Sequence, residues 1–104
     1  MLKPRPATGG GGQRFEGEWH VTRVAIMGVI VEDMDSVEAL NGLLHECGRF
    51  IIGRMGLPYR ERGVSVISVV LDAPQDTISA LAGKVGALPG VSVKTLYSNV
   101  SGGE

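Results

Sequence analysis

Two short segments of the sequence are apolar at almost every position, and they limit the folds that this chain can adopt. Residues 23–31 read RVAIMGVIV and residues 64–71 read VSVISVVL. Both are rich in β-branched residues, which favour strands, and neither alternates cleanly between apolar and polar positions. Since an alternating strand would keep one face in water, residues 23–31 are predicted to be a strand buried on both faces, and residues 64–71 a second, almost wholly apolar strand.

Two further segments carry apolar residues at helical spacing. The first stripe comprises Val37, Leu40, Leu44 and Cys47. The second stripe comprises Ile78, Leu81, Val85 and Leu88. Asp35, three residues before Glu38, is predicted to cap the first helix, and Gly48 to end it. Asp72 is predicted to cap the second helix, with Pro74 in its first turn.

Two less regular segments, residues 50–57 and 91–98, complete the order β-α-β-β-α-β. This order predicts an α+β, ferredoxin-like sandwich, a four-stranded antiparallel sheet with two helices on one face. The first and third strands would be central and the second and fourth would be at the edges. Arg54 and Pro58 near the second strand and Lys94 in the fourth agree, because edge strands tolerate charge and proline.

The second face of this sheet needs a cover, because two helices can cover only one face. In residues 23–31, the alternate positions on one side of the strand include Val24, Ile26 and Ile30, and the alternate positions on the other side are apolar as well. We expect a second copy of the chain to cover this open sheet face, giving a homo-oligomer, either a dimer or a tetramer. The alternative is that Phe15 and Trp19, which precede the domain, fold over it.

Composition and charge suggest three segments and a cellular setting. Residues 1–20 contain four successive glycines and three basic residues among the first fourteen, so we expect a disordered basic leader, a domain over 21–98 and a frayed tail over 99–104. The formal net charge of −1 gives no overall attraction to nucleic acid or to an anionic membrane. The single cysteine fits a cytoplasmic protein, and we expect no membrane span and no secretory signal.

Three stretches carry a resemblance to a known family. They read VAIMGVIVED, LLHECGRFIIGRMGLPYRERGVSVISVVLDAP and LAGKVGALPGVSVKTLYS, and IIGRMGLPYRERGV is the most specific part. Over residues 22–98 the chain resembles the iron-only hydrogenase system regulator family. Its members are small ACT-like domains, similar in fold to the C-terminal ligand-binding domain of nickel-responsive repressors. The resemblance implies a regulatory role near iron-only hydrogenase maturation.

Arginine side chains form the first group of candidate binding residues. The group comprises Arg49, Arg54, Arg60 and Arg62, with Tyr59 and Glu61 among them. Guanidinium groups bind carboxylates and phosphates through paired hydrogen bonds, so this group suggests an anion-binding or partner-docking patch. The alternative is a solvated hairpin turn with surface ion pairs.

The loop after the first strand is the second candidate binding region. It contains Glu32, Asp33 and Asp35. The resemblance implies a binding role, because this loop of ACT-like domains commonly helps to bind the effector, often at a subunit interface. An acidic loop would favour a cationic or amino-group-bearing effector. The alternative is that these residues only cap the following helix.

No residue pattern indicates catalysis, a cofactor or a metal. Cys47 and His45 are two positions apart, and such positions on a helix do not face one another. Cys47 also completes the first apolar stripe, so we expect a buried structural thiol. The likeness to nickel repressors directs attention to His20, His45 and Cys47, but two ligands within the domain fall short of a closed metal site.

We therefore expect a non-enzymatic regulatory module that senses a small-molecule effector or binds a protein partner, and that acts as an oligomer. The alternative function is a regulator that contacts nucleic acid through the basic leader. An enzyme of unknown type is disfavoured by the missing catalytic pattern. The sequence does not identify the effector, the partner or the regulated process.

Overall fold

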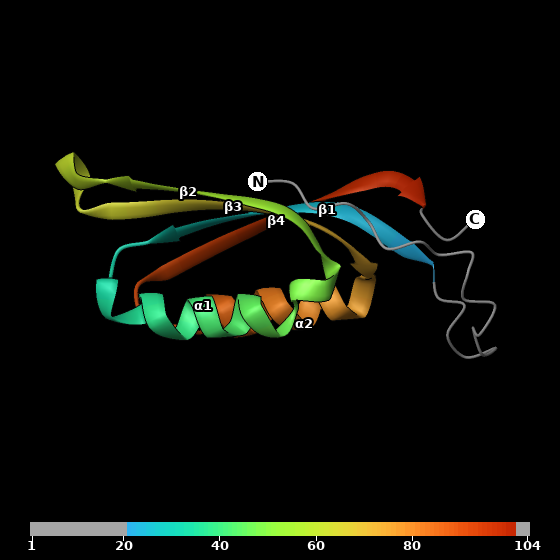
Figure 1. Cartoon of the computed structure of the whole chain (residues 1–104), viewed down its shortest axis with the longest axis horizontal. Helices are drawn as coiled ribbons and strands as arrows, with labels where there is room; N and C mark the ends of the chain where they lie inside the picture. The colour runs from blue at the N-terminus through green and yellow to red at the C-terminus, as the bar shows by residue number, and fades with distance from the viewer. Residues whose placement is uncertain (1–20, 102–104) are drawn as a thin grey trace.

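Both of the almost wholly apolar segments are strands, and they pair with each other at the centre of one antiparallel sheet (Figure 1). The computed structural model describes residues 21–101, with only the backbone at positions 100 and 101. The central strands are β1 (Thr22–Val31) and β3 (Val64–Pro74), and the edge strands are β2 (Ile51–Tyr59) and β4 (Val91–Ser101). The strand order β2-β3-β1-β4 confirms the predicted ferredoxin-like fold.

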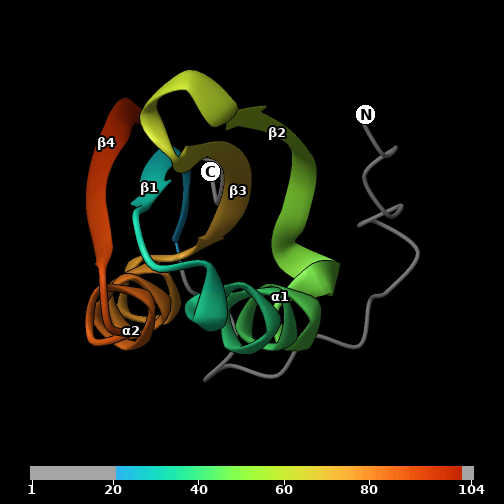
Figure 2. The ribbon, with the colours of Figure 1, turned by 90° about the vertical axis from the view of Figure 1, so that its left-hand side faces the viewer.

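Both helices lie on the same face of the sheet. Figure 2 shows α2 (Gln75–Gly86) beneath β4 and β1, and α1 (Val37–Glu46) beneath β3 and β2. Three short 3-10 turns complete the fold: η2 (Met34–Ser36), η3 (Gly48–Phe50) and η4 (Arg60–Arg62). Within residues 21–101 no helix is long and apolar enough to span a membrane.

The core lies between the helices and one parity of the central strands. Its residues are Ala25, Met27, Val29 and Val31 from β1, Ile67, Val69, Leu71 and Ala73 from β3, Leu40 and Leu44 from α1, Ile78, Leu81 and Val85 from α2, and Ile51 and Val91 from the edge strands. The helical members of this set come from the two predicted stripes, because apolar residues three or four apart share one helix face.

Both predicted helix caps are wrong. The turn η2 precedes α1, and the carboxylate of Asp33, not Asp35, accepts a hydrogen bond there, from the backbone N–H of Asp35 at 3.0 Å. Asp72 lies within β3, because the strand continues to Pro74 and α2 begins only at Gln75. The buried side chain of Ala73 continues the core-facing alternation of β3, which explains the longer strand.

The chain ends also differ in part from expectation. Residues 99–101 continue β4, whereas we expected a frayed tail from residue 99. The backbone of Ser101 pairs with Arg23 across a bulge, so the pairing with β1 extends this strand. The expected leader over residues 1–20, with Phe15, Trp19 and His20, lies outside the described residues, as do residues 102–104.

Candidate functional site

The acidic loop follows β1 directly and is fixed to the start of β4. The backbone N–H of Glu32 donates to the carbonyl oxygen of Gly90 at 2.7 Å. The half-buried carboxylate of Asp33 is engaged by the N–H of Asp35, which matches the capping role considered for this loop. The side chains of Glu32 and Asp35 are exposed. Two carboxylates of the loop therefore face solvent from a fixed backbone.

The tip of the β2–β3 hairpin lies at the same end of the sheet as the acidic loop. The last residue of β1, Val31, pairs with Ser65 near the start of β3, so both groups flank this end. Tyr59, Arg60 and Arg62 are all exposed there, and the hydroxyl of Tyr59 donates to the carboxylate of Glu61 at 3.0 Å. The hairpin tip projects beyond the helix layer (Figure 1).

Arg54 lies elsewhere, so it and the tip arginines do not form one patch. Arg54 pairs in register with the core residue Val69, and its guanidinium donates to Oδ1 of Asn41 on α1 at 3.1 Å. It borders a pocket of about 250 Å³ between α1 and β2. The other lining residues are Asn41, Leu44, His45, Gly48, Ile51 and Gly53. Arg49 is separately engaged, with its guanidinium 4.8 Å from the ring centroid of Phe50.

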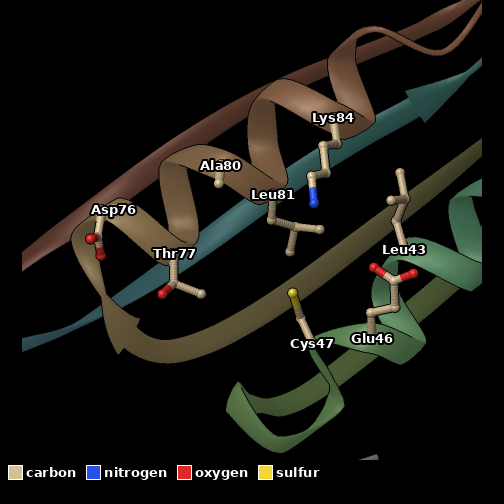
Figure 3. Close-up of a pocket in the computed structure, with 8 residues that line it drawn as sticks. All are labelled: Leu43, Glu46, Cys47, Asp76, Thr77, Ala80, Leu81 and Lys84. Carbon is tan, nitrogen blue, oxygen red and sulfur yellow. The ribbon is translucent and has the colours of Figure 1, made fainter. Parts of the chain in front are cut away.

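A groove of about 300 Å³ runs between the two helices (Figure 3). Its lining residues are Leu43, Glu46, Cys47, Asp76, Thr77, Ala80, Leu81 and Lys84. The thiol of Cys47 points into this groove and is only half-buried, whereas we expected a buried thiol. Sequence reasoning missed the groove because its residues come from two helices that only the folded packing brings together.

The two candidate metal ligands within residues 21–101, His45 and Cys47, are separated. His45 lines the pocket beside Arg54, and Cys47 lines the groove between the helices. Among residues 21–101, no group of three or more His, Cys, Asp or Glu side chains is placed to hold a metal ion.

The sheet side that points away from the helices, here called the open face, presents apolar side chains to solvent. Its exposed large residues are Ile26, Ile30, Met55, Leu57, Tyr59, Val66 and Leu96. Met55, Leu57 and Leu96 are 68%, 60% and 70% exposed, values far from those of a core. The prediction that the helices leave one apolar parity of the central strands uncovered is confirmed.

Comparisons with known proteins agree with this architecture. The solved structure of "uncharacterized protein TM1266 from Thermotoga maritima" is 38% identical, and the match covers 73% of this chain and 96% of that protein with a TM-score of 0.71. A formyltetrahydrofolate deformylase from Pseudomonas putida KT2440 is 17% identical over 74% of this chain and 29% of the enzyme, with a TM-score of 0.55. The deformylase supports the fold alone. No curated protein matches the chain.

One family model matches residues 23–95, from the start of β1 into β4. The description of that family is "TM1266-like: Iron-only hydrogenase system regulator, putative". The match covers more than half of the 104 residues and includes both helices and the hairpin. The chain therefore belongs to the TM1266-like family of iron-only hydrogenase system regulators.

Proposed function

We propose that this chain is a non-enzymatic regulatory module of the iron-only hydrogenase system, and that it acts as a homo-oligomer joined through the open face. Membership of the TM1266-like family supports the regulatory role. The single observation that supports the oligomer is the open face, an apolar sheet surface that spans all four strands.

The physical argument is the cost of leaving such a surface in water. Burying apolar surface stabilises an assembly by about 25 cal/mol per Å² before the costs of association are subtracted. Soluble monomers rarely expose contiguous apolar patches larger than a few hundred Å². A charged and exposed side chain, that of Lys94, lies at the margin of the open face on the edge strand β4. An apolar centre with a polar margin is the usual arrangement of an interface.

We further propose that an effector or partner binds at the end of the sheet that carries the acidic loop and the hairpin tip. The exposed carboxylates of Glu32 and Asp35 would attract an amino group, with Asp33 fixing the loop. Tyr59, Arg60 and Arg62 would bind a carboxylate or a phosphate. Arg54 belongs to a separate pocket, and we propose it as a second, independent anion contact.

The effector proposal is tested by thermal shift with the full chain. Amines, carboxylates and phosphates would be screened on the wild type and on two double variants. The first variant carries Glu32→Gln and Asp35→Asn, and the second carries Arg60→Ala and Arg62→Ala. Amine-induced stabilisation should be lost only in the first variant, and anion-induced stabilisation only in the second. A shift that both variants retain would place binding elsewhere.

The oligomer proposal is tested by sedimentation of the full chain from about 1 to about 100 µM. We expect an oligomer, and we expect the same oligomer after deletion of residues 1–20. A wild type that stays monomeric over this range would refute the proposal. An oligomer that is lost only on the deletion would show that the N-terminal segment makes the contact.

A further inference from the structure

The side chains of the open face lie in rows that cross the strands. The register pairs Leu57 with Val66 and Val66 with Ile30, which forms one apolar row, here called the hairpin ridge. Four residues further along the strands, Val70, Ile26 and Leu96 form a second apolar row, here called the distal ridge. Because alternate residues of a strand share a face, neighbouring rows are about 6.8 Å apart and the two ridges about 13.5 Å apart.

The row between the ridges is hollow at its centre. Its members across the sheet are Met55, Ser68, Gly28 and Lys94. Ser68 and Gly28, on the two central strands, are the small members, and we call these two positions the trough. A Cβ atom built on Gly28 would have the backbone oxygen of Lys94, 3.9 Å away, as its nearest neighbour. Residues 21–101 therefore leave open the space directly above Gly28.

We propose that a second copy of this chain docks on the open face with the hairpin ridge of each subunit seated in the trough of the other. This inference rests on the proposed homo-oligomer and adds its register. A two-fold axis that runs parallel to the rows, midway between hairpin ridge and trough, exchanges the two rows. Ile30 then lies over the partner's Gly28 and Val66 over the partner's Ser68, and both contacts occur twice because the interface is isologous.

Self-complementarity favours a second copy over an unrelated partner. The ridge and the trough are neighbouring rows of one sheet, so their spacing and strand positions match without any further adjustment. The same axis places the row of Tyr59 and Val64 against the partner's distal ridge, where Val64 faces the partner's Val70 and Tyr59 faces the partner's Gly53. Sheets that stack face to face lie about 10 Å apart, close enough for one row of side chains to interlock between them.

The area is sufficient for a specific contact. Four strands about 4.8 Å apart and four overlapping rows about 6.8 Å apart cover roughly 500 Å² on each subunit. The two subunits together would bury about 1,000 Å², which reaches the lower limit of specific interfaces. This area treats each face as flat, and the projecting side chains add to it.

The test adds a side chain in the trough, at Gly28, and separately shortens the side chain of the hairpin ridge that should contact it, Ile30. Gly28→Val in the full chain should raise the dimer dissociation constant at least about thirtyfold, because each of two symmetric contacts is overpacked. Ile30→Ala should also weaken the dimer, by leaving two holes. An equimolar mixture of the two variants should form a heterodimer of nearly wild-type affinity. At one contact of that heterodimer, the valine introduced at position 28 meets the alanine introduced at position 30, so the added and the removed volume compensate. At the other contact, the unchanged Ile30 of one subunit meets the unchanged Gly28 of the other, as in the wild type.

Sedimentation equilibrium and native mass spectrometry would measure the species, and circular dichroism would confirm that each variant is folded. Ser68→Val mixed with Val66→Ala repeats the design on β3 and replaces the first pair if either member fails to fold. A mixture that stays monomeric, or a Gly28→Val variant that dimerises as the wild type does, would overturn this register while the oligomer proposal stands. A monomeric wild type would overturn both. The matched control is Gly42→Val on α1, where a Cβ meets no described atom within 4 Å beyond its chain neighbours and its own helix backbone. This change should leave the dimer unchanged.

Discussion

Gly90 lies so close to Asp33 that a Cβ atom on Gly90 would stand 2.6 Å from the Cβ of Asp33 and 2.9 Å from its backbone nitrogen. Gly90 also has a φ of +68°, in the left-handed region that favours glycine. Its carbonyl oxygen accepts the N–H of Glu32. The turn before β4 therefore fixes the backbone of the acidic loop, on which the proposed effector contact depends.

Gly90→Ala should destabilise the domain by about 2–4 kcal/mol, because the added methyl group meets backbone atoms and the left-handed φ is strained. Gly63→Ala is the matched control, since Gly63 has the same φ of +68° but a Cβ there meets no described atom within 4 Å beyond its chain neighbours. It should cost only about 1 kcal/mol. Urea unfolding of both variants would measure the difference. Equal losses would show that the close approach to Asp33 contributes nothing.

Arg23 joins three elements at the other end of the sheet. Its guanidinium donates to Oε1 of Gln75 at the start of α2 at 3.0 Å and to the carbonyl oxygen of Ser98 on β4 at 2.9 Å. It also lies 5.1 Å from the ring centroid of Tyr97. We expect Arg23→Lys to cost about 1–2 kcal/mol, because a single ammonium group cannot reproduce this planar geometry.

Chemical denaturation would measure this loss, with Gln75→Ala as the control. That change removes only the exposed hydrogen bond and should cost less than about 0.5 kcal/mol. If Arg23→Lys were as stable as the wild type, the contacts to Ser98 and Tyr97 would carry no net stability.

The tip arginines should be dispensable for folding. Arg60 and Arg62 are exposed in η4, so Arg60→Ala and Arg62→Ala should each change the free energy of unfolding by no more than about 0.5 kcal/mol. Thermal denaturation of the two variants is sufficient to check this. A loss of several kcal/mol in either variant would mean that the guanidinium makes a structural contact in the assembled protein.

The sequence predicts the order of the elements and the sheet topology because both follow from local periodicity. The β-branched run from Val64 to Leu71 predicts a strand, and the stripe of Ile78, Leu81 and Val85 predicts one helix face. The caps were harder to predict. A strand that packs Ala73 into the core outweighs the local preference of Asp72 for a helix start.

The candidate site was only partly predictable. Proximity in sequence suggested that Arg54 joins Arg60 and Arg62, but alternation along β2 and the distance along the strand separate them. The importance of Gly90 and Arg23 depends on tertiary contacts with residues far away in the sequence, as the contacts to Asp33 and Ser98 show. No local pattern contains that information.

The most decisive experiment compares substitutions on the two faces of β1, because the sequence alone did not identify which set of alternate residues faces the helices. Val29 is fully buried against the helices, whereas Ile26 is 40% exposed on the open face, three residues away in the same strand. Val29→Glu should unfold the chain, because an unpaired carboxylate in the core costs several kcal/mol of a total stability of about 5–15 kcal/mol. Ile26→Glu should remain folded and become monomeric, because its carboxylate is solvated in the free subunit and buried only in the assembly. Circular dichroism and sedimentation of the two variants separate these outcomes. An Ile26→Glu variant that stays oligomeric would show that subunits associate through another surface, and one that unfolds would show that the open face is covered within the subunit itself.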